Sequence, residues 1–456
     1  MGPQQIVAWT EQNIKLGDRR RSIALGDFAW ALIKSGTVSI AAIGRQVVGA
    51  AIESSKIARV FNFCHNLKID PWQVQQALFR VLVAIPLVGK VVGSMRYVLL
   101  SIDWHQFDHG EESSLRVSLM VGSRAIPLLW YDVKTSDLKG RQRMIEDRAL
   151  EDLVRLQPVG VVWVLLLDAG FRCSKRIQRM KEVFKFVQRT NCRDKVHGAT
   201  LCWTEPRHLG VQSGQVVDFG WVEWCRTDPV QVRLVATYVK VPQKRRRRRA
   251  STRHKSRRQD EGWFLLTNLD AELFPALQVV TYYARRFECE HNFRDIKNAS
   301  LGLDMEHVHL LTAATYERLM CIVAVASVLL WLFGSEAEAN GWATRLSPSR
   351  PKQPRRILSL VNVGKLKAAS VRRSIRGLIL KHLVPALQKV HAHVGPSWIH
   401  PSQPNLVLQG AAWREEDIQP APRPCRAKKK PLPCQPAVIH FVLNRAPIQG
   451  VYQLAA

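Results

Sequence analysis

The chain has 456 residues, too many for one ordinary domain, so about two to four domains are expected. Hydrophobic residues make up 46% of it, which is enough to form a core. Lys and Arg outnumber Asp and Glu by 67 to 37, giving a formal net charge of +30. Such an excess attracts polyphosphates and predicts a nucleic-acid partner, with an anionic membrane surface or simple solubility as alternatives.

The cysteines and the N-terminus exclude several other classes. Nine cysteines are scattered without a Cys-x-x-Cys pair, so neither a zinc site nor a disulfide framework is expected. The first residues, MGPQQIVAWTEQ, lack the basic and apolar segments of a signal peptide. The longest apolar run, residues 319–334, is shorter than the roughly 20 residues that cross a bilayer. We expect this run to form a buried helix and the protein to have no membrane partner.

Residues 1–90 are predicted to form an N-terminal helical module that binds DNA. Apolar residues recur at helical spacing in 22–34, 39–52 and 72–85, with short polar turns between them. A basic cluster at 19–21 opens the second helix. Such a module suits a DNA groove, and a helical cap on the next domain is the alternative.

Residues 91–190 are predicted to form the first part of an α/β core. Short β-rich stretches at 97–102, 115–121 and 125–133 precede a helical period at 140–156. The apolar run VVWVLLL at 161–167 is typical of a strand buried on both faces. A helix at 174–181 and a strand at 183–189 follow. The order β-β-β-α-β-α-β is that of an RNase H-like sheet with helices packed on it.

Residues 191–270 interrupt this pattern and are predicted to form a mostly β insertion. Strands are expected at 216–223, 230–240 and 263–267, with no long helix between them. Inside the insertion, residues 244–258 carry ten Lys or Arg in fifteen positions, a run too self-repelling to fold alone. It is expected to lie along DNA and to release counterions, and a solvated loop is compatible with that role. Its predicted DNA contacts are Arg245, Arg246, Arg247, Arg248 and Arg249.

Long helices are expected again from residue 278 to about 334, so residues 271–335 would complete the core. A further helical segment is expected at about 356–394, after prolines at 348, 351 and 354. The rest of the chain is Pro-rich and basic, as in RPCRAKKKPLP, and is expected to be irregular. Residues 336–456 are therefore predicted to be a C-terminal helical region with a Pro-rich basic tail.

Two aspartates follow predicted strands directly. Asp103 comes after the strand at 97–102, and Asp168 comes after the strand at 161–167. Carboxylates held at a sheet edge suit metal-assisted phosphoryl chemistry, because Mg²⁺ prefers oxygen ligands and takes one or two carboxylates besides substrate phosphate. For either residue alone, a strand-ending or helix-capping role is the alternative.

A third carboxylate is expected on the helix near residue 290. At 3.6 residues per turn, Tyr283, Arg286, Glu290 and Lys297 fall within roughly a 60° arc of one face of this helix. A neighbouring stripe, formed by residues 282, 289, 293 and 296, suits a core, while residue 288 points away from both. Glu290 is therefore the better metal ligand, with the cations and the phenol beside it available for phosphate oxygens. A solvated, salt-bridged face is the alternative.

Several sequence blocks resemble the insertion-sequence-four family of bacterial DDE transposases. The Tyr-(2)-Arg-(3)-Glu-(6)-Lys signature is met in YARRFECEHNFRDIK by Tyr283, Arg286, Glu290 and Lys297. SIDWH and LLLDAGFRC resemble the two catalytic aspartate blocks, WFLLTNL the strand before the signature helix, and TYERLMCIVAVASVLLWL the helix after it. ARVFNFCHN resembles a block upstream of the core. The resemblance covers about residues 90–335.

The resemblance implies an α/β fold with an RNase H-like catalytic core interrupted by a β insertion. It implies that Asp103, Asp168 and Glu290 bind two Mg²⁺ or Mn²⁺ ions. The DNA backbone near the transposon end would be held by Tyr283, Arg286 and Lys297, with Arg294 on the same helix as a further contact.

Trp263 lies close to where relatives place a tryptophan that stacks on a base flipped from the duplex. Stacking of this kind stabilises by about 1–3 kcal/mol per base. A buried insertion-domain tryptophan accounts for Trp263 equally well. The sequence departs from the family pattern at His105, Phe287 and Cys289, positions expected to affect packing and not metal binding.

The resemblance implies metal-dependent cleavage at transposon ends followed by strand transfer into target DNA. In cut-and-paste relatives the freed 3′-OH attacks the opposite strand to form a hairpin. The expected partners are double-stranded DNA, as terminal inverted repeats and target, and a second copy of the chain. A bacterial, nucleoid-associated cytoplasmic location is expected. The alternatives are an RNase H-fold nuclease without strand transfer and an inactive DNA-binding derivative.

Overall fold

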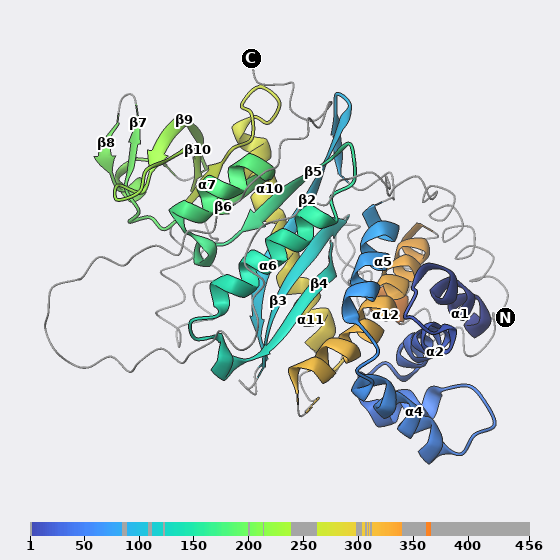
Figure 1. Cartoon of the computed structure of the whole chain (residues 1–456). Helices are drawn as coiled ribbons and strands as arrows, with labels where there is room; N and C mark the ends of the chain where they lie inside the picture. The colour runs from blue at the N-terminus through green and yellow to red at the C-terminus, as the bar shows by residue number, and fades with distance from the viewer. Residues whose placement is uncertain are drawn as a thin grey trace, which may run out of the picture. The chain divides into compact units, whose positions relative to one another are not determined.

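One mixed β-sheet runs through the part of the chain that the structure describes (Figure 1). The computed structural model describes residues 2–365 except 84–88, 108–111, 122–123, 199–200, 213, 239–261, 298–302, 306–307, 309, 311 and 340–361. All of them belong to one unit, Met1–Pro396, while a second unit, Ser397–Ala456, lies outside them. The predicted DNA contacts at 245–249, most of the predicted helix at 356–394 and the Pro-rich tail therefore lie outside the described residues.

The sheet has eleven strands, in the order β4-β3-β2-β5-β6-β11-β10-β9-β7-β8, with β1 paired to β2. Strands β2, β5 and β6 are parallel to one another, and the strands on either side of them pair antiparallel. The strand bounds are β1 Lys90–Val92, β2 Met95–Gln106, β3 Glu112–Val121, β4 Arg124–Lys134, β5 Val161–Leu167, β6 Lys185–Arg189, β7 Val196–Gly198, β8 Leu201–Thr204, β9 Val216–Trp224, β10 Val230–Thr237 and β11 Trp263–Thr267.

The predicted order of core elements is confirmed. Strands β2, β3 and β4 precede helix α6 (Gln142–Arg155), and β5, helix α7 (Ser174–Val183) and β6 follow it. The bounds of β5 and β11 are those predicted from their apolar runs. Because β5 is covered on both faces, six of its seven residues are buried.

Helices cover both faces of the core sheet. Helices α6 and α7 pack on one face, where their buried Leu153 and Ile177 join strand residues such as Ile102 and Phe186 (Figure 1). Helices α10 (Ala276–Arg285) and α11 (Glu288–Lys297) supply Tyr282, Cys289 and Phe293 to a second core, with strand residues such as Leu99 and Leu166. Successive strand residues point to opposite faces, so each core strand feeds both clusters.

The helical prediction for residues 1–90 is confirmed, although the predicted 39–52 helix is shorter in the structure. The helices are α1 Gly2–Asn13, α2 Arg19–Ser35, α3 Ile40–Gln46, α4 Glu53–His65 and α5 Pro71–Val83. Helix α2 starts where Asp18 accepts a bond from the Arg20 N–H and ends at Gly36, whose φ of 71° suits a left-handed cap. Helices α2, α4 and α5 all contact α12 (Ala313–Ala339).

The long apolar helix is buried, as predicted. Its window Ala313–Gly334 has a mean hydropathy of 1.8, long and apolar enough to cross a membrane, but 89% of that window is buried inside the protein. Helices α2 and α3 satisfy the same criterion only as a pair bent by 101°. Strand β4 and helices α2, α4 and α5 contact α12 and account for its burial.

The β insertion continues the core sheet. Strand β11, predicted within the insertion, pairs antiparallel with β6 of the core through Leu265↔Arg189, and β10 pairs with β11 on its other side. The strands β9, β7 and β8 extend the sheet further in the same direction. The strands of the insertion and the strands of the core therefore form one continuous hydrogen-bonded sheet.

Candidate active site

Asp103 and Asp168 lie just beyond the parallel ladder that joins β2 and β5. Asp168 follows the last residue of β5, whereas Asp103 lies inside β2, which continues to Gln106 and pairs Asp103 with Arg116 of β3. Strands β2 and β5 are parallel and in register up to Ile102↔Leu167, so the two aspartates are the next residues along each strand. Asp168 Oδ1 accepts a 2.7 Å hydrogen bond from the Gly170 N–H and caps the short helix Ala169–Phe171. The predicted strand-end placement is therefore observed for Asp168, whose carboxylate is held by the turn that follows it. For Asp103 the prediction is wrong, because β2 stays paired with β3 for three residues beyond it.

The prediction of one continuous signature helix is wrong. Helix α10 ends at Arg285 and α11 begins at Glu288. The N–H groups of Arg286, Phe287 and Cys289 donate to carbonyls three residues earlier, at 2.9, 3.3 and 3.0 Å. These i to i−3 bonds tighten the backbone and break the α-helical ladder. The prediction that residues on both sides of the break share one helix face therefore does not hold. The predicted core stripe is nevertheless buried: Tyr282, Cys289, Phe293 and Ile296.

Arg286, at this break, interacts with the three candidate carboxylates. Its Nη1 lies 2.9 Å from Asp103 Oδ2 and its Nη2 lies 3.9 Å from Glu290 Oε1. Burial opposes the charge of Arg286, but the neighbouring Tyr283, Asp103 and Asp168 outweigh it, and the pKa of Arg286 is raised. One guanidinium thus interacts with all three carboxylates that the sequence singled out.

The three carboxylates also interact with one another. The pKa of Asp103 is raised from 3.8 to about 6, first by burial and then by the charges of Asp168 and Glu290, while Arg286 lowers it. Glu290 is the most open of the three, with a side chain 54% exposed against 15% for Asp103. As the side chains stand, no group of three or more His, Cys, Asp or Glu in the described ranges is close enough to hold a metal ion.

The donor set nevertheless suits a divalent cation. Three carboxylates supply hard oxygen ligands, the kind that Mg²⁺ and Mn²⁺ take in proteins. The raised pKa of Asp103 reflects, after burial, negative charge from two neighbours that a cation would offset. The cation that now offsets it is Arg286, so the site fits a metal ion in its charge and chemistry.

Three aromatic rings pack beside the break. Trp263, the first residue of β11, is half-buried; its ring lies edge-on to Tyr283 at 5.2 Å and stacked with Phe287 at 5.6 Å. The side chain of Tyr283 is only 1% exposed, and the Arg286 guanidinium lies 5.8 Å from its ring centre. Tyr283 and Trp263 therefore pack against each other in this structure, and their contacts with DNA stay predictions.

The remaining predicted contacts lie along α11. Arg294 is exposed. Lys297 Nζ donates to the Gln106 carbonyl at 3.2 Å, at the end of β2, and lies 5.6 Å from the centre of the Phe107 ring. Both cations are on α11, the helix that carries Glu290, and Lys297 contacts β2, the strand that carries Asp103.

His105 helps to hold α11 on the sheet. Its ring stacks on Phe293 of α11 at 4.2 Å, and burial, together with the nearby Arg116 and Lys297, lowers the pKa of His105 to about 2. The imidazole is therefore neutral, and this departure from the family pattern is a packing contact. Cys289 is buried below the site, where burial raises the pKa of its thiol to about 12.

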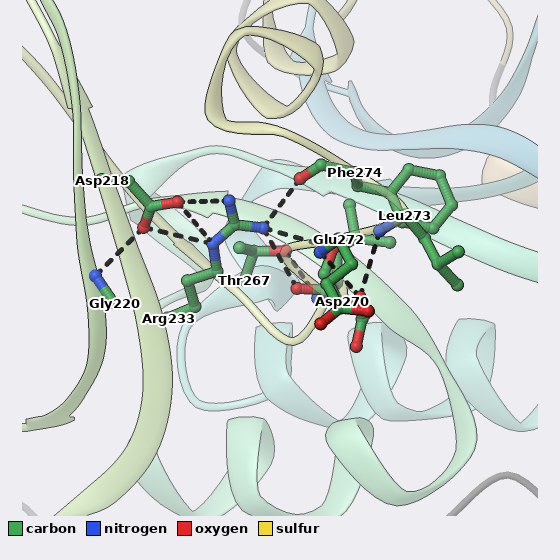
Figure 2. A network of polar contacts seen from close by, with 9 residues as sticks. Asp218, Gly220, Arg233, Thr267, Asp270, Glu272, Leu273 and Phe274 are labelled. Carbon is green, nitrogen blue, oxygen red and sulfur yellow. Dashed lines mark hydrogen bonds and ion pairs between the residues drawn. The ribbon is translucent and has the colours of Figure 1, made fainter.

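A buried arginine, which the sequence reading did not single out, fixes the start of α10 (Figure 2). Arg233 of β10 is 1% exposed and its Nε lies 3.1 Å from Asp218 Oδ2 of β9. Its Nη1 donates to the carbonyls of Leu269, Asp270 and Phe274 at 3.3, 3.4 and 2.8 Å. The network joins two insertion strands to the loop that leads into the signature segment.

Comparison with known proteins agrees with this geometry. Residues 119–329 match the family model described as a transposase DDE domain. Asp168 and Glu290 lie inside the matched region, and Asp103 lies before it. No curated protein matches the chain. The match supports a DDE transposase family, and with it an enzyme that acts on DNA.

Proposed function

We propose that this chain is the transposase of an insertion sequence, of the insertion-sequence-four family, which cleaves transposon ends and joins them to target DNA. Asp103, Asp168 and Glu290 would hold two Mg²⁺ or Mn²⁺ ions. The proposal depends above all on one observation, the interaction of all three carboxylates with Arg286 inside a chain that matches a transposase domain.

When bound, the metal ions would activate the attacking oxygen and stabilise the charge that develops on the leaving 3′ oxygen. The residues of the chain would do the rest. Asp103, held inside β2, and Asp168, directly after β5, would fix the position of the site, while the more exposed Glu290 would close it from α11. No organic cofactor and no covalent intermediate are required for such transfers.

DNA would be held by the cations around this site. Arg286 has two donors in a planar fork, which suits two oxygens of one phosphate, and Lys297 and Arg294 follow on α11. Tyr283 and Trp263 would contact the transposon end from beside the helix break. The basic residues 245–249, which lie outside the described part of the chain, would add sequence-independent phosphate contacts.

The remaining parts of the proposal concern architecture. The order of strands and helices from β2 to β6 supports an RNase H-like core, and the helices of residues 2–83 support a separate N-terminal module. Helices α2, α4 and α5 also pack against α12. We therefore propose that the N-terminal helices both cover the core and bind DNA. We further propose that two copies act together on two transposon ends in the bacterial nucleoid.

The test is cleavage of a labelled duplex that carries the inverted repeat flanking this gene, in the presence of Mg²⁺. Glu290→Gln and Asp168→Asn are expected to abolish cleavage while retaining DNA binding. Glu288→Gln is the matched control, because Glu288 lies two residues away in the same helix but pairs with Arg285 at 3.2 Å. Cleavage that persists in Glu290→Gln would contradict the assignment.

Two alternatives are distinguished in the same experiment. A nuclease of similar fold would cleave the labelled end without producing joined DNA molecules. An inactive derivative would bind the repeat without cleaving it. Joined products from the unaltered chain, and their loss in both carboxylate variants, are the expected result.

A further inference from the structure

Strand β2 presents two consecutive residues to opposite faces of the sheet. Asp103 faces the break between α10 and α11, where it meets Arg286, and Trp104 faces α6. On that second face, Trp104 Nε1 donates a 2.8 Å hydrogen bond to Glu146 Oε1. The residue next to a candidate metal ligand is therefore tied to a buried carboxylate on the far side of the sheet.

Glu146 is an unusual residue to bury, and its partners explain how it is tolerated. It is 3% exposed, and Gln142 Nε2 donates to the same Oε1 at 2.9 Å. Its Oε2 accepts a 2.5 Å bond from Arg176 Nη1, and Arg176 Nε donates to Asp147 Oδ1 at 3.0 Å. A buried ion pair with both carboxylate oxygens satisfied holds one geometry, because any shift leaves a charge without partners.

Arg176 connects this pair to the second aspartate. It lies in the first turn of α7, the helix that follows Asp168 after the short helix Ala169–Phe171. The connection runs from Trp104 through Glu146 of α6 to Arg176 of α7, that is, from the residue after Asp103 to the helix after Asp168. The parallel ladder between β2 and β5 reaches only to Ile102↔Leu167, one residue short of both aspartates.

We propose that Trp104, Glu146 and Arg176 form a positioning network that sets the separation of the Asp103 and Asp168 carboxylates for metal binding. This inference rests on the proposed function. The hydrogen bonds that join the three side chains lie on the face of the sheet away from Arg286, and the backbone of Trp104 is hydrogen-bonded to the Asp103 carboxylate. Each acts through the backbone that carries an aspartate, in the way that residues behind metal ligands orient them elsewhere.

The mildest test is Trp104→Phe, which removes one N–H donor and keeps an aromatic ring. Glu146 keeps Gln142 and Arg176 as partners, so no charge is left unpaired. We expect the Mg²⁺ concentration for half-maximal cleavage to rise about tenfold, with DNA affinity measured without metal unchanged. Mn²⁺ binding to the DNA-free protein, followed by electron paramagnetic resonance, should weaken by the same factor.

Tyr131→Phe is the matched control for stability. Tyr131 donates a 2.8 Å bond to Asp152, a buried carboxylate on the same helix α6. Loss of this bond should lower the melting temperature without changing the metal requirement. Glu146→Gln is a second variant, which replaces the charged partner of Arg176 by a neutral one. Its effect on the metal requirement should be less than additive with that of Trp104→Phe, because both changes act on one network.

The outcomes separate this inference from the proposed function. If the unaltered chain cleaves and binds Mn²⁺ but Trp104→Phe behaves like Tyr131→Phe, the positioning network is wrong and the proposed function stands. If the unaltered chain neither cleaves repeat DNA nor binds Mn²⁺, the proposed function fails and the inference fails with it. A metal requirement that shifts only in Trp104→Phe and Glu146→Gln supports both.

Discussion

Arg286 Nη1 lies 2.9 Å from Asp103 Oδ2, so a side chain expected to hold DNA phosphate is paired with a carboxylate expected to hold metal. The same guanidinium is 3.9 Å from Glu290. A metal ion and Arg286 would therefore compete for one set of oxygens. If a metal ion displaces Arg286 from Asp103, the guanidinium becomes available to a phosphate of bound DNA.

The first prediction concerns this competition. Arg286→Gln removes the resident positive charge, so Mn²⁺ should bind the DNA-free protein at least about tenfold more tightly, as expected for a cation this close at low exposure. Cleavage of repeat DNA should nevertheless fall, because the phosphate contact is lost. Isothermal titration calorimetry measures the first effect. Arg285→Gln, which removes the pair with Glu288, should change neither. Equal or weaker Mn²⁺ binding in Arg286→Gln would contradict the competition.

The second prediction concerns Arg233 (Figure 2). Arg233→Met leaves Asp218 and three carbonyls without their buried partner and should lower the free energy of unfolding by about 3 kcal/mol. Amide exchange should rise in the loop at 268–275, which these bonds hold. Chemical denaturation and hydrogen exchange measure the two effects. Arg19→Met, at a surface pair 76% exposed on the arginine side, should leave both unchanged.

The third prediction concerns pH. Burial, and then the charge of Asp132, raises the pKa of Glu317 on α12 from 4.5 to about 7. The folded state therefore binds this proton more tightly than the unfolded state, so its contribution to stability is present below pH 4.5 and is lost as the pH rises to about 7. Glu317→Gln should remove this part of the decline. Melting temperatures of both proteins between pH 4.5 and 8 test this, and a constant difference would contradict it.

The fourth prediction concerns Trp263. Trp263→Ala removes the ring that packs on Tyr283 and Phe287 and, if Trp263 stacks on a flipped base, about 1–3 kcal/mol of stacking. Cleavage should then fall on a fully paired end but recover on an end with a mismatched base, since less unpairing is required. Equal loss on both substrates would show that Trp263 is a packing residue. Trp263→Phe, which keeps an aromatic ring, should cleave the fully paired end at a rate between those of the unaltered chain and Trp263→Ala.

The sequence was sufficient to predict the order of the core strands and the position of Asp168 after β5, but not that β2 continues through Asp103 to Gln106. Continuous apolar runs such as 161–167 determine where a doubly buried strand lies, and the next polar residue then falls at the sheet edge. The helix break after Arg285 was not predictable in this way, because its residues carry no proline or glycine and fit a helical period. It depends on backbone bonds three residues apart and on the pairing of Arg286 with a strand nearly two hundred residues earlier.

Long-range polar partners were also beyond the sequence. Nothing local marks Glu146 as the partner of Trp104, or Arg233 as the residue that holds the 268–275 loop. Each is an ordinary charged residue until the fold buries it opposite a group far away in the chain. Their charge does not identify them, because charged residues are common along the whole sequence.

The pairing of Thr237 with Trp263 has a topological consequence for the most basic stretch of the chain. The chain leaves β10 at Thr237 and enters β11 at Trp263, which are paired in one ladder, so the segment between them begins and ends at one place in the sheet. This segment includes residues 244–258, and a tether fixed at both ends gives its ten cations a high effective concentration around that place. A shorter or longer tether would thus change how quickly DNA is captured, while the sheet that anchors it stays the same.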